Sequence, residues 1–229
     1  MFIYRKINEF LENNKNIFNS IIDYTNVSEN LTNDNIKELC KNASENNFHS
    51  VCILSKFVIP VKSFIKDNTK ICSLIDFPYG KSSLKNKVKE IEESIINGAD
   101  EIDVVINYNL IKELEYHNDL KTEIRELTEY CHKEGKIIKI IIEIGFLNYQ
   151  EIETICKMCI ESSVDFIMTS TGKLSNDNTF ENKVEKVKYI RSILPDEVKI
   201  KFSGGIRTNE QIKELKPIVD RIGTSIIPL

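Results

Sequence analysis

Two charged side chains interrupt otherwise apolar runs of the sequence. Asp103 lies in EIDVVINYN, residues 101–109, where strand alternation places it on one face with Val105 and Asn107. Lys201 lies in VKIKFSGGIRT, residues 198–208, close to the end of the apolar run. A buried carboxylate is costly unless it is paired, so Asp103 predicts either a reactive group or a structural ion pair. Lys201 can serve as an amine with a shifted pKa, as a phosphate ligand or as the partner of Asp103.

Glycine and hydroxyl residues follow three of the later apolar runs. They occur in STGK at 170–173, in SGG at 203–205 and in RIGTS at 221–225. Glycine lets backbone N–H groups approach an anion closely. Each motif alone is ordinary turn chemistry, but the three together favour a phosphorylated ligand.

The hydrophobic periodicity alternates between short strand-like runs and longer helical stretches. Strands are predicted at 17–23, 50–54, 70–76, 101–107, 136–143, 165–169, 198–202 and 221–223. Helices are predicted at 33–46, 83–97, 149–162, 182–194 and 209–215, with one broken helix over 109–134. Continuous Ile/Val runs are typical of strands that are covered on both faces. The pattern predicts an α/β fold, a (β/α)8 TIM barrel that forms one domain over residues 1–229.

The two ends of the chain depart from a simple barrel. Residues 1–16 predict an N-terminal amphipathic helix. Only residues 225–229 follow the last predicted strand, so the eighth helix is expected to be missing or truncated. The N-terminal helix, a subunit partner or a further C-terminal segment could cover the resulting gap.

Composition narrows the function classes. Lys and Arg number 31 and Asp and Glu 35, so a net charge of −4 gives no general attraction to nucleic acid or to anionic membranes. The sequence has no apolar run of about 20 residues and no secretory signal. The six cysteines are expected to be free thiols in the cytoplasm. Cys156 and Cys159 lack a second pair and the three histidines lack ligand spacing, so neither a metal nor a cofactor is predicted.

A set of motifs in a fixed order carries a family resemblance. The motifs are IIDYTN, SVCIL, DFPYG, GADEIDVVINY, KIIIEIGFL, DFIMTSTGK, KFSGGIRT and RIGTS. Together they span nearly the whole chain, which resembles the deoxyribose-phosphate aldolase family. The resemblance implies a TIM-barrel lyase of carbohydrate and deoxyribonucleotide catabolism. Its reaction is the reversible cleavage of 2-deoxy-D-ribose 5-phosphate to glyceraldehyde 3-phosphate and acetaldehyde, through a lysine Schiff base.

The resemblance also implies roles for individual residues. Asp103 matches the proton-relay aspartate, and Lys201 matches the second lysine, whose charge lowers the pKa of the Schiff-base amine. Cys52 matches a cysteine that lines the site. Polar positions inside the barrel are matched by Asp23, Thr25, Lys139 and Glu143. The surroundings of the substrate phosphate are matched by Thr171, Gly172, Lys173, Gly204, Gly205, Gly223 and Ser225.

Three positions depart from the family pattern. Met168 stands where the family has its Schiff-base lysine, Ile144 where threonine is usual, and Ile226 where a second serine is usual. Three hypotheses follow: an aldolase by descent that is crippled at position 168, an aldolase in which Lys201 replaces the lost amine, or a non-catalytic sugar-phosphate binder or assembly subunit. The expected partner is a small phosphorylated sugar or aldehyde, with a homo-oligomer as a further possibility and neither nucleic acid nor membrane.

Overall fold

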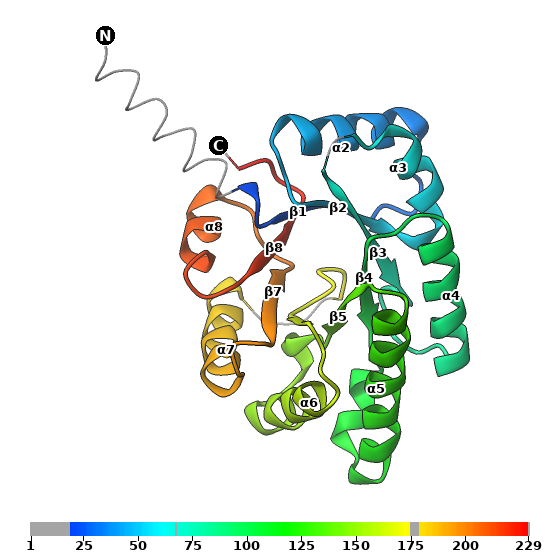
Figure 1. Cartoon of the computed structure of the whole chain (residues 1–229). Coiled ribbons are helices and arrows are strands. Elements are labelled where there is room, and N and C mark those ends of the chain that lie inside the picture. The colour runs from blue at the N-terminus through cyan, green and yellow to red at the C-terminus, as the bar shows by residue number, and fades with distance from the viewer. Residues whose placement is uncertain (1–18, 67, 175–178, 229) are drawn as a thin grey trace.

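Eight parallel strands close into a barrel in chain order, each paired with its sequence neighbours and β8 with β1. The computed structural model describes residues 19–66, 68–174 and 179–228. The strands are β1 Ile22–Asn26, β2 Ser50–Leu54, β3 Lys70–Ile75, β4 Glu101–Val105, β5 Ile137–Ile141, β6 Phe166–Met168, β7 Lys199–Ser203 and β8 Arg221–Thr224. Figure 1 shows the barrel with its helices arranged around the outside. The predicted TIM barrel is confirmed.

One α-helix lies between each pair of consecutive strands. The helices are α2 Asn33–Glu45, α3 Val58–Phe64, α4 Leu84–Ile96, α5 His117–Lys133, α6 Tyr149–Glu161, α7 Phe180–Ile193 and α8 Asn209–Leu215. Short 3-10 turns cover Ser55–Phe57, Tyr108–Lys112, Leu114–Tyr116 and Ile144–Phe146. Side-chain caps define several starts: the hydroxyl of Thr32 accepts a hydrogen bond from the Asn35 amide in a capping box. None of the helices in the described ranges is long and apolar enough to cross a membrane.

Some predicted element bounds are wrong. β1 begins at Ile22 rather than at residue 17, and residues 17 and 18 lie outside the described residues, as does the predicted N-terminal helix. β4 ends at Val105, so Asn107 no longer follows the strand alternation. Helix α3 is a missed element: it has seven residues and contains Pro60, so it carries little helical periodicity. The break expected within 109–134 falls before His117, where α5 begins.

No helix follows β8 in residues 225–228, the last that the structure describes. The barrel nevertheless closes, because Ile22 pairs with Ile222 and Tyr24 with Thr224.

Strand alternation divides the core into two parts. Outward-facing residues such as Ile102, Val104 and Ile138 are fully buried between the sheet and the helices. Inside the barrel, one layer is an apolar ring that consists of Cys52, Leu54, Cys72, Leu74, Val105, Ile141 and Met168. The next positions toward the strand beginnings carry charges instead. Inside the barrel, an apolar layer of side chains therefore lies next to a charged layer.

Candidate active site

Six charged side chains form a closed ring of ion pairs inside the barrel. Lys201 Nζ lies 2.6 Å from Asp103 Oδ2 and 2.7 Å from Asp23 Oδ2. Lys139 Nζ lies 2.8 Å from Asp103 Oδ1 and 2.6 Å from Glu101 Oε2. The guanidinium of Arg221 closes the ring, 2.8 Å from Asp23 Oδ1 and 2.9 Å from Glu101 Oε1. We call Asp23, Glu101, Asp103, Lys139, Lys201 and Arg221 the charge ring.

Each member of the charge ring stabilises the ionised form of its neighbours. Burial opposes ionisation of Asp103, but the ammonium groups of Lys139 and Lys201 outweigh it and hold the pKa of Asp103 below its ordinary value. The pKa values of Asp23 and Glu101 are lowered in the same way. Burial also opposes the charge on Lys201, yet Asp103 and Asp23 raise its pKa well above the ordinary value. The ring therefore holds three cations and three anions at neutral pH.

The charge ring predicts a steep loss of stability in acid. The folded-state pKa values of Asp23, Glu101 and Asp103 are lowered, so between about pH 5 and pH 3 the unfolded chain binds more protons than the native chain. The free energy of unfolding should therefore be fully present at neutral pH and fall across that window. Urea unfolding at a series of pH values measures it. The Asp103→Asn variant should show a shallower slope, whereas Glu93→Gln, at an exposed carboxylate, should keep the original slope. A stability that does not change between pH 6 and 3 would contradict the ring.

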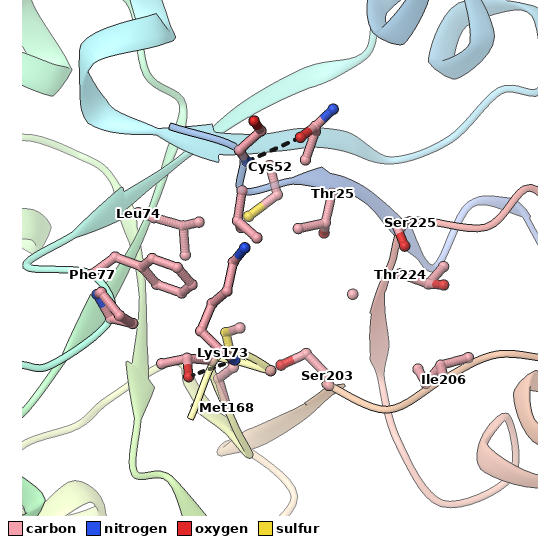
Figure 2. Close-up of a pocket in the computed structure, with 18 of the residues that line it drawn as sticks. Thr25, Cys52, Leu74, Phe77, Met168, Lys173, Ser203, Ile206, Thr224 and Ser225 are labelled. Atoms are coloured by element: carbon pink, nitrogen blue, oxygen red, sulfur yellow. Dashed lines mark hydrogen bonds between the residues drawn. The ribbon is translucent and has the colours of Figure 1, made fainter. Parts of the chain in front are cut away.

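A cavity of about 750 Å³ opens at the C-terminal ends of the strands. Of the predicted site residues, it is lined by Thr25, Cys52, Met168, Thr171, Gly172, Lys173, Gly204, Gly205, Gly223 and Ser225. Figure 2 shows labelled side chains from different strands and loops around the same space, among them Cys52, Leu74, Phe77 and Met168. The C-terminal end of such a barrel is where ligands bind.

Lys201 lies against residues of the cavity lining, such as Gly223, but is not part of the lining itself. Its side chain is fully buried and lies beside Met168 in the strand register. Asp23, Asp103, Lys139 and Glu143 are likewise buried and do not line the cavity. The expected proximity of Lys201 and Asp103 is confirmed by their 2.6 Å contact. The two groups thus form part of the support of the site.

Met168 contributes a thioether to the cavity wall. Its side chain is only 4% exposed and belongs to the apolar ring with Leu74, Val105 and Ile141. The sulfur has no N–H that could condense with an aldehyde. Lys173, in the turn after β6, is the one lysine among the described residues that line the cavity.

Two glycine turns meet at one side of the cavity. Gly172 and Gly204 both have positive φ values, of 71° and 81°. A Cβ on Gly204 would lie 2.9 Å from the Gly172 Cα, so neither turn has room for a side chain there. The strands below are tied together, because Thr169 Oγ1 accepts a hydrogen bond of 2.9 Å from the Ser203 amide. Glycine turns of this kind can present backbone N–H groups to a phosphate.

Glu143 fastens the first of these turns from behind. Its Oε2 accepts a hydrogen bond of 2.8 Å from the Thr171 amide. The backbone of Glu143 is left-handed, with φ of 51°, and its side chain is buried. Burial raises the pKa of Glu143, against the opposing hydrogen bonds from Thr171.

Sequence reasoning missed several residues of the site. Leu74, Phe77, Tyr79, Ser203 and Thr224 also line the cavity. Alternation could have revealed the two missed members of the charge ring, because Glu101 lies two residues before Asp103 and Arg221 two before Gly223. The departures at Ile144 and Ile226 were expected to alter the site, but neither residue lines the cavity. Ile144 is fully buried in the outer core, and Ile226 packs against that core.

One cluster has the composition of a metal site. Ligand atoms of Cys52, Cys72 and Asp103 lie within 4.8 Å of one another. Both carboxylate oxygens of Asp103 already contact lysine ammonium groups. Burial and the neighbouring Cys52 raise the pKa of the Cys72 thiol well above its ordinary value, so this ligand is held in its protonated form. These three side chains are therefore poorly suited to bind a metal cation, because Asp103 is already paired within the charge ring.

Comparisons with known proteins agree on one family. The family model described as DeoC/LacD family aldolase matches residues 17–220. A deoxyribose-phosphate aldolase from Mycoplasmoides gallisepticum is 38% identical over 211 residues, which cover 91% of each chain. One from Dictyoglomus turgidum is 39% identical over 206 residues, 89% of this chain and 91% of the relative.

Solved structures give the same assignment. A putative deoxyribose-phosphate aldolase from Coccidioides immitis superposes with a TM-score of 0.84 at 29% identity, covering 92% of this chain and 83% of the other. A structure described as QR15, an aldolase, superposes with a TM-score of 0.82 at 32% identity, covering 91% of each chain. By sequence and by structure, the chain belongs to the DeoC/LacD family of aldolases.

Proposed function

We propose that the chain binds a phosphorylated sugar of the 2-deoxyribose 5-phosphate class in the cavity at the barrel mouth. In this proposal the turns at Gly172 and Gly204–Gly205 hold the phosphate, and the sugar extends toward Met168. The close approach of the two glycine turns is the observation that carries the proposal. The names of the relatives, which are deoxyribose-phosphate aldolases, support the ligand class.

We further propose that the Schiff-base route of the family is closed in this chain. A Schiff base requires a neutral amine that the aldehyde can reach. Position 168 has no amine, and the ammonium of Lys201 lies between two carboxylates at 2.6 and 2.7 Å. Asp103 and Asp23 keep the pKa of Lys201 raised, so its amine is neither neutral nor accessible. This geometry argues against Lys201 as a replacement nucleophile.

Binding and covalent trapping test the two halves of the proposal separately. Isothermal titration calorimetry should detect binding of 2-deoxyribose 5-phosphate, and much weaker binding of 2-deoxyribose. Incubation with the sugar phosphate followed by borohydride reduction should leave the mass of the protein unchanged. An adduct on Lys201 would show that the ammonium can be released and would restore the aldolase assignment. An adduct on Lys173 would identify the accessible lysine of the cavity as the nucleophile.

Substitution of Gly204 should weaken phosphate binding. In Gly204→Ala the new methyl group would meet the Gly172 Cα at 2.9 Å, and the left-handed backbone would be strained as well. The two turns must then separate, so we expect the affinity for 2-deoxyribose 5-phosphate to fall by at least about tenfold, since 1.4 kcal/mol corresponds to a factor of ten.

The matched control is Gly135→Ala. Gly135 also has a positive φ, of 65°, but a Cβ there meets nothing within 4 Å. This variant carries the backbone strain without the steric contact, so its stability should fall while its affinity stays unchanged. Equal affinities for the two variants would refute the assignment of the phosphate to these turns.

We also propose that the protein forms a homo-oligomer. A related structure from Aeropyrum pernix, which superposes with a TM-score of 0.79 at 23% identity, is described as tetrameric. The outer surface of this chain exposes Ile96 to 76% and Leu114 to 84%, and burying such side chains favours association. Light scattering of the purified protein measures the mass of the assembly directly.

A further inference from the structure

A buried lysine without a partner lies behind the second glycine turn. Lys183, in the first turns of α7, is only 8% exposed. Within the described part of the chain, its ammonium has neither a hydrogen bond nor an ion pair. A methyl group built on Gly205 would lie 4.0 Å from Lys183 Nζ, the one contact within 4 Å of that position. The ammonium therefore points at the backbone of a residue that lines the cavity.

The nearest acidic influence on Lys183 is Glu143, but the two do not form an ion pair. The Glu143 carboxylate accepts the hydrogen bond from the Thr171 amide instead. Burial lowers the pKa of Lys183, and the charge of Glu143 only partly opposes this. A buried cation without a contacting anion destabilises the folded protein.

A second lysine of α7, Lys186, does have hydrogen-bond partners. The ammonium of Lys186, three residues later, donates hydrogen bonds of 2.8 Å to the carbonyls of Ile144 and Leu147. Lys186 thus fastens the loop after β5 to α7. Lys183 makes no such bond to the described residues, although it is the more deeply buried of the two.

We propose that Lys183 is a phosphate-binding residue whose ammonium supplies the positive charge behind the Gly204–Gly205 turn. This inference rests on the proposed function, in which the same turn holds the phosphate of the sugar. The N–H groups of the turn orient the phosphate oxygens but carry no net charge. The Lys183 ammonium attracts the dianion at short range, and the largely buried side chain holds it close to the turn. Phosphate in turn provides the anion that the buried lysine lacks.

The proposal predicts opposite effects on stability and on binding. The Lys183→Met variant retains the length of the side chain and removes the isolated charge, so the unliganded protein should melt at a higher temperature. The same variant should bind inorganic phosphate and 2-deoxyribose 5-phosphate about tenfold more weakly, a reasonable scale for one partly screened charge at short range. Lys183→Arg retains the charge and should keep most of the affinity. A residue with a merely structural role would lower the melting temperature when replaced.

The control is Lys188→Met, which removes one positive charge from an exposed position of the same helix. Its phosphate affinity should stay within about twofold of the unaltered protein, since exposed charges are screened by salt. Calorimetry with inorganic phosphate and with 2-deoxyribose 5-phosphate gives the affinities, and thermal unfolding without ligand gives the stabilities. Undiminished phosphate binding by Lys183→Met would overturn this inference alone. Failure of the unaltered protein to bind either phosphate compound would overturn the proposed function and this inference together.

Discussion

Replacement of Met168 by lysine should give the chain Schiff-base-dependent cleavage of 2-deoxyribose 5-phosphate. We expect a rate several orders of magnitude above that of the unaltered chain, the scale on which rates fall when a covalent nucleophile is removed. The Met168 side chain already reaches the cavity wall, and lysine has a stem of similar length. The introduced amine would therefore need no rearrangement of β6.

The surroundings of position 168 would also adjust the pKa of the introduced amine. Met168 pairs with Lys201 in the strand register, so a permanent ammonium would lie on the adjacent strand. The apolar ring adds a second contribution, because Leu74, Val105 and Ile141 exclude water from this layer. A nearby like charge and burial both favour the neutral amine, which is the nucleophilic form.

Two further variants decide whether the amine is responsible for the gain. Met168→Gln has a side chain of similar length without a nucleophile and should remain inactive. The combined variant Met168→Lys with Gly204→Ala should form the borohydride-reducible adduct with acetaldehyde, which has no phosphate, yet cleave the sugar phosphate poorly. Absence of both adduct and cleavage in Met168→Lys would mean that the cavity differs from a working aldolase site in more than this residue.

The structure favours an intact cavity around that substitution. The changes at Ile144 and Ile226 first suggested a site that had lost polar groups in several places. Ile144 belongs to the outer core and Ile226 packs against it, and neither side chain lines the cavity. In the proposed function, position 168 is therefore the departure that affects the chemistry.

Most of the barrel could be predicted because its strands are short, apolar and evenly spaced. Five predicted helices were found at similar bounds and the sixth, α5, begins only at His117, whereas α3 was missed because seven residues around Pro60 show no clear period. The start of β1 was misplaced because Ile17 to Ile21 are also largely apolar. The first residue of β1 depends on pairing with the neighbouring strands, which the local sequence does not reveal. In the structure, Ile22 pairs with Ile222.

The candidate site was less predictable than the fold because it depends on how deep each side chain lies inside the barrel. Alternation placed Asp103 on one face with Val105, yet the sequence could not show that Asp103 and Lys201 pair without lining the cavity. Depth depends on the stagger of the strands around the barrel. The stagger places Lys201 opposite Arg221 and Met168, and so between Asp23 and Asp103. Lys183 was not predicted at all, because a lysine in a helix usually faces solvent.

Because Lys201 belongs to the charge ring, we expect it to stabilise the folded protein. In Lys201→Met, the Asp103 carboxylate would keep Lys139 as its one cationic partner in the charge ring, and Asp23 would keep Arg221, inside a buried layer. Removing one partner of a buried ion pair typically costs about 3–5 kcal/mol, because the remaining charge is left without compensation. We expect a loss of that size in the free energy of unfolding, measured by urea denaturation at neutral pH.

A double variant separates the charge imbalance from the loss of packing. Removing both a cation and an anion in Lys201→Met with Asp103→Leu restores neutrality to the layer, although it leaves Lys139 with Glu101 alone. The double variant should therefore be more stable than the sum of the two single losses predicts. Lys89→Met serves as the exposed control: its ion pair with Glu93 lies on the surface of α4, where such pairs contribute about 0–1 kcal/mol. If Lys201→Met lost no more stability than Lys89→Met, the contacts of Lys201 would not hold the charge ring together. Its amine would then be available for the chemistry that we assign to position 168 alone.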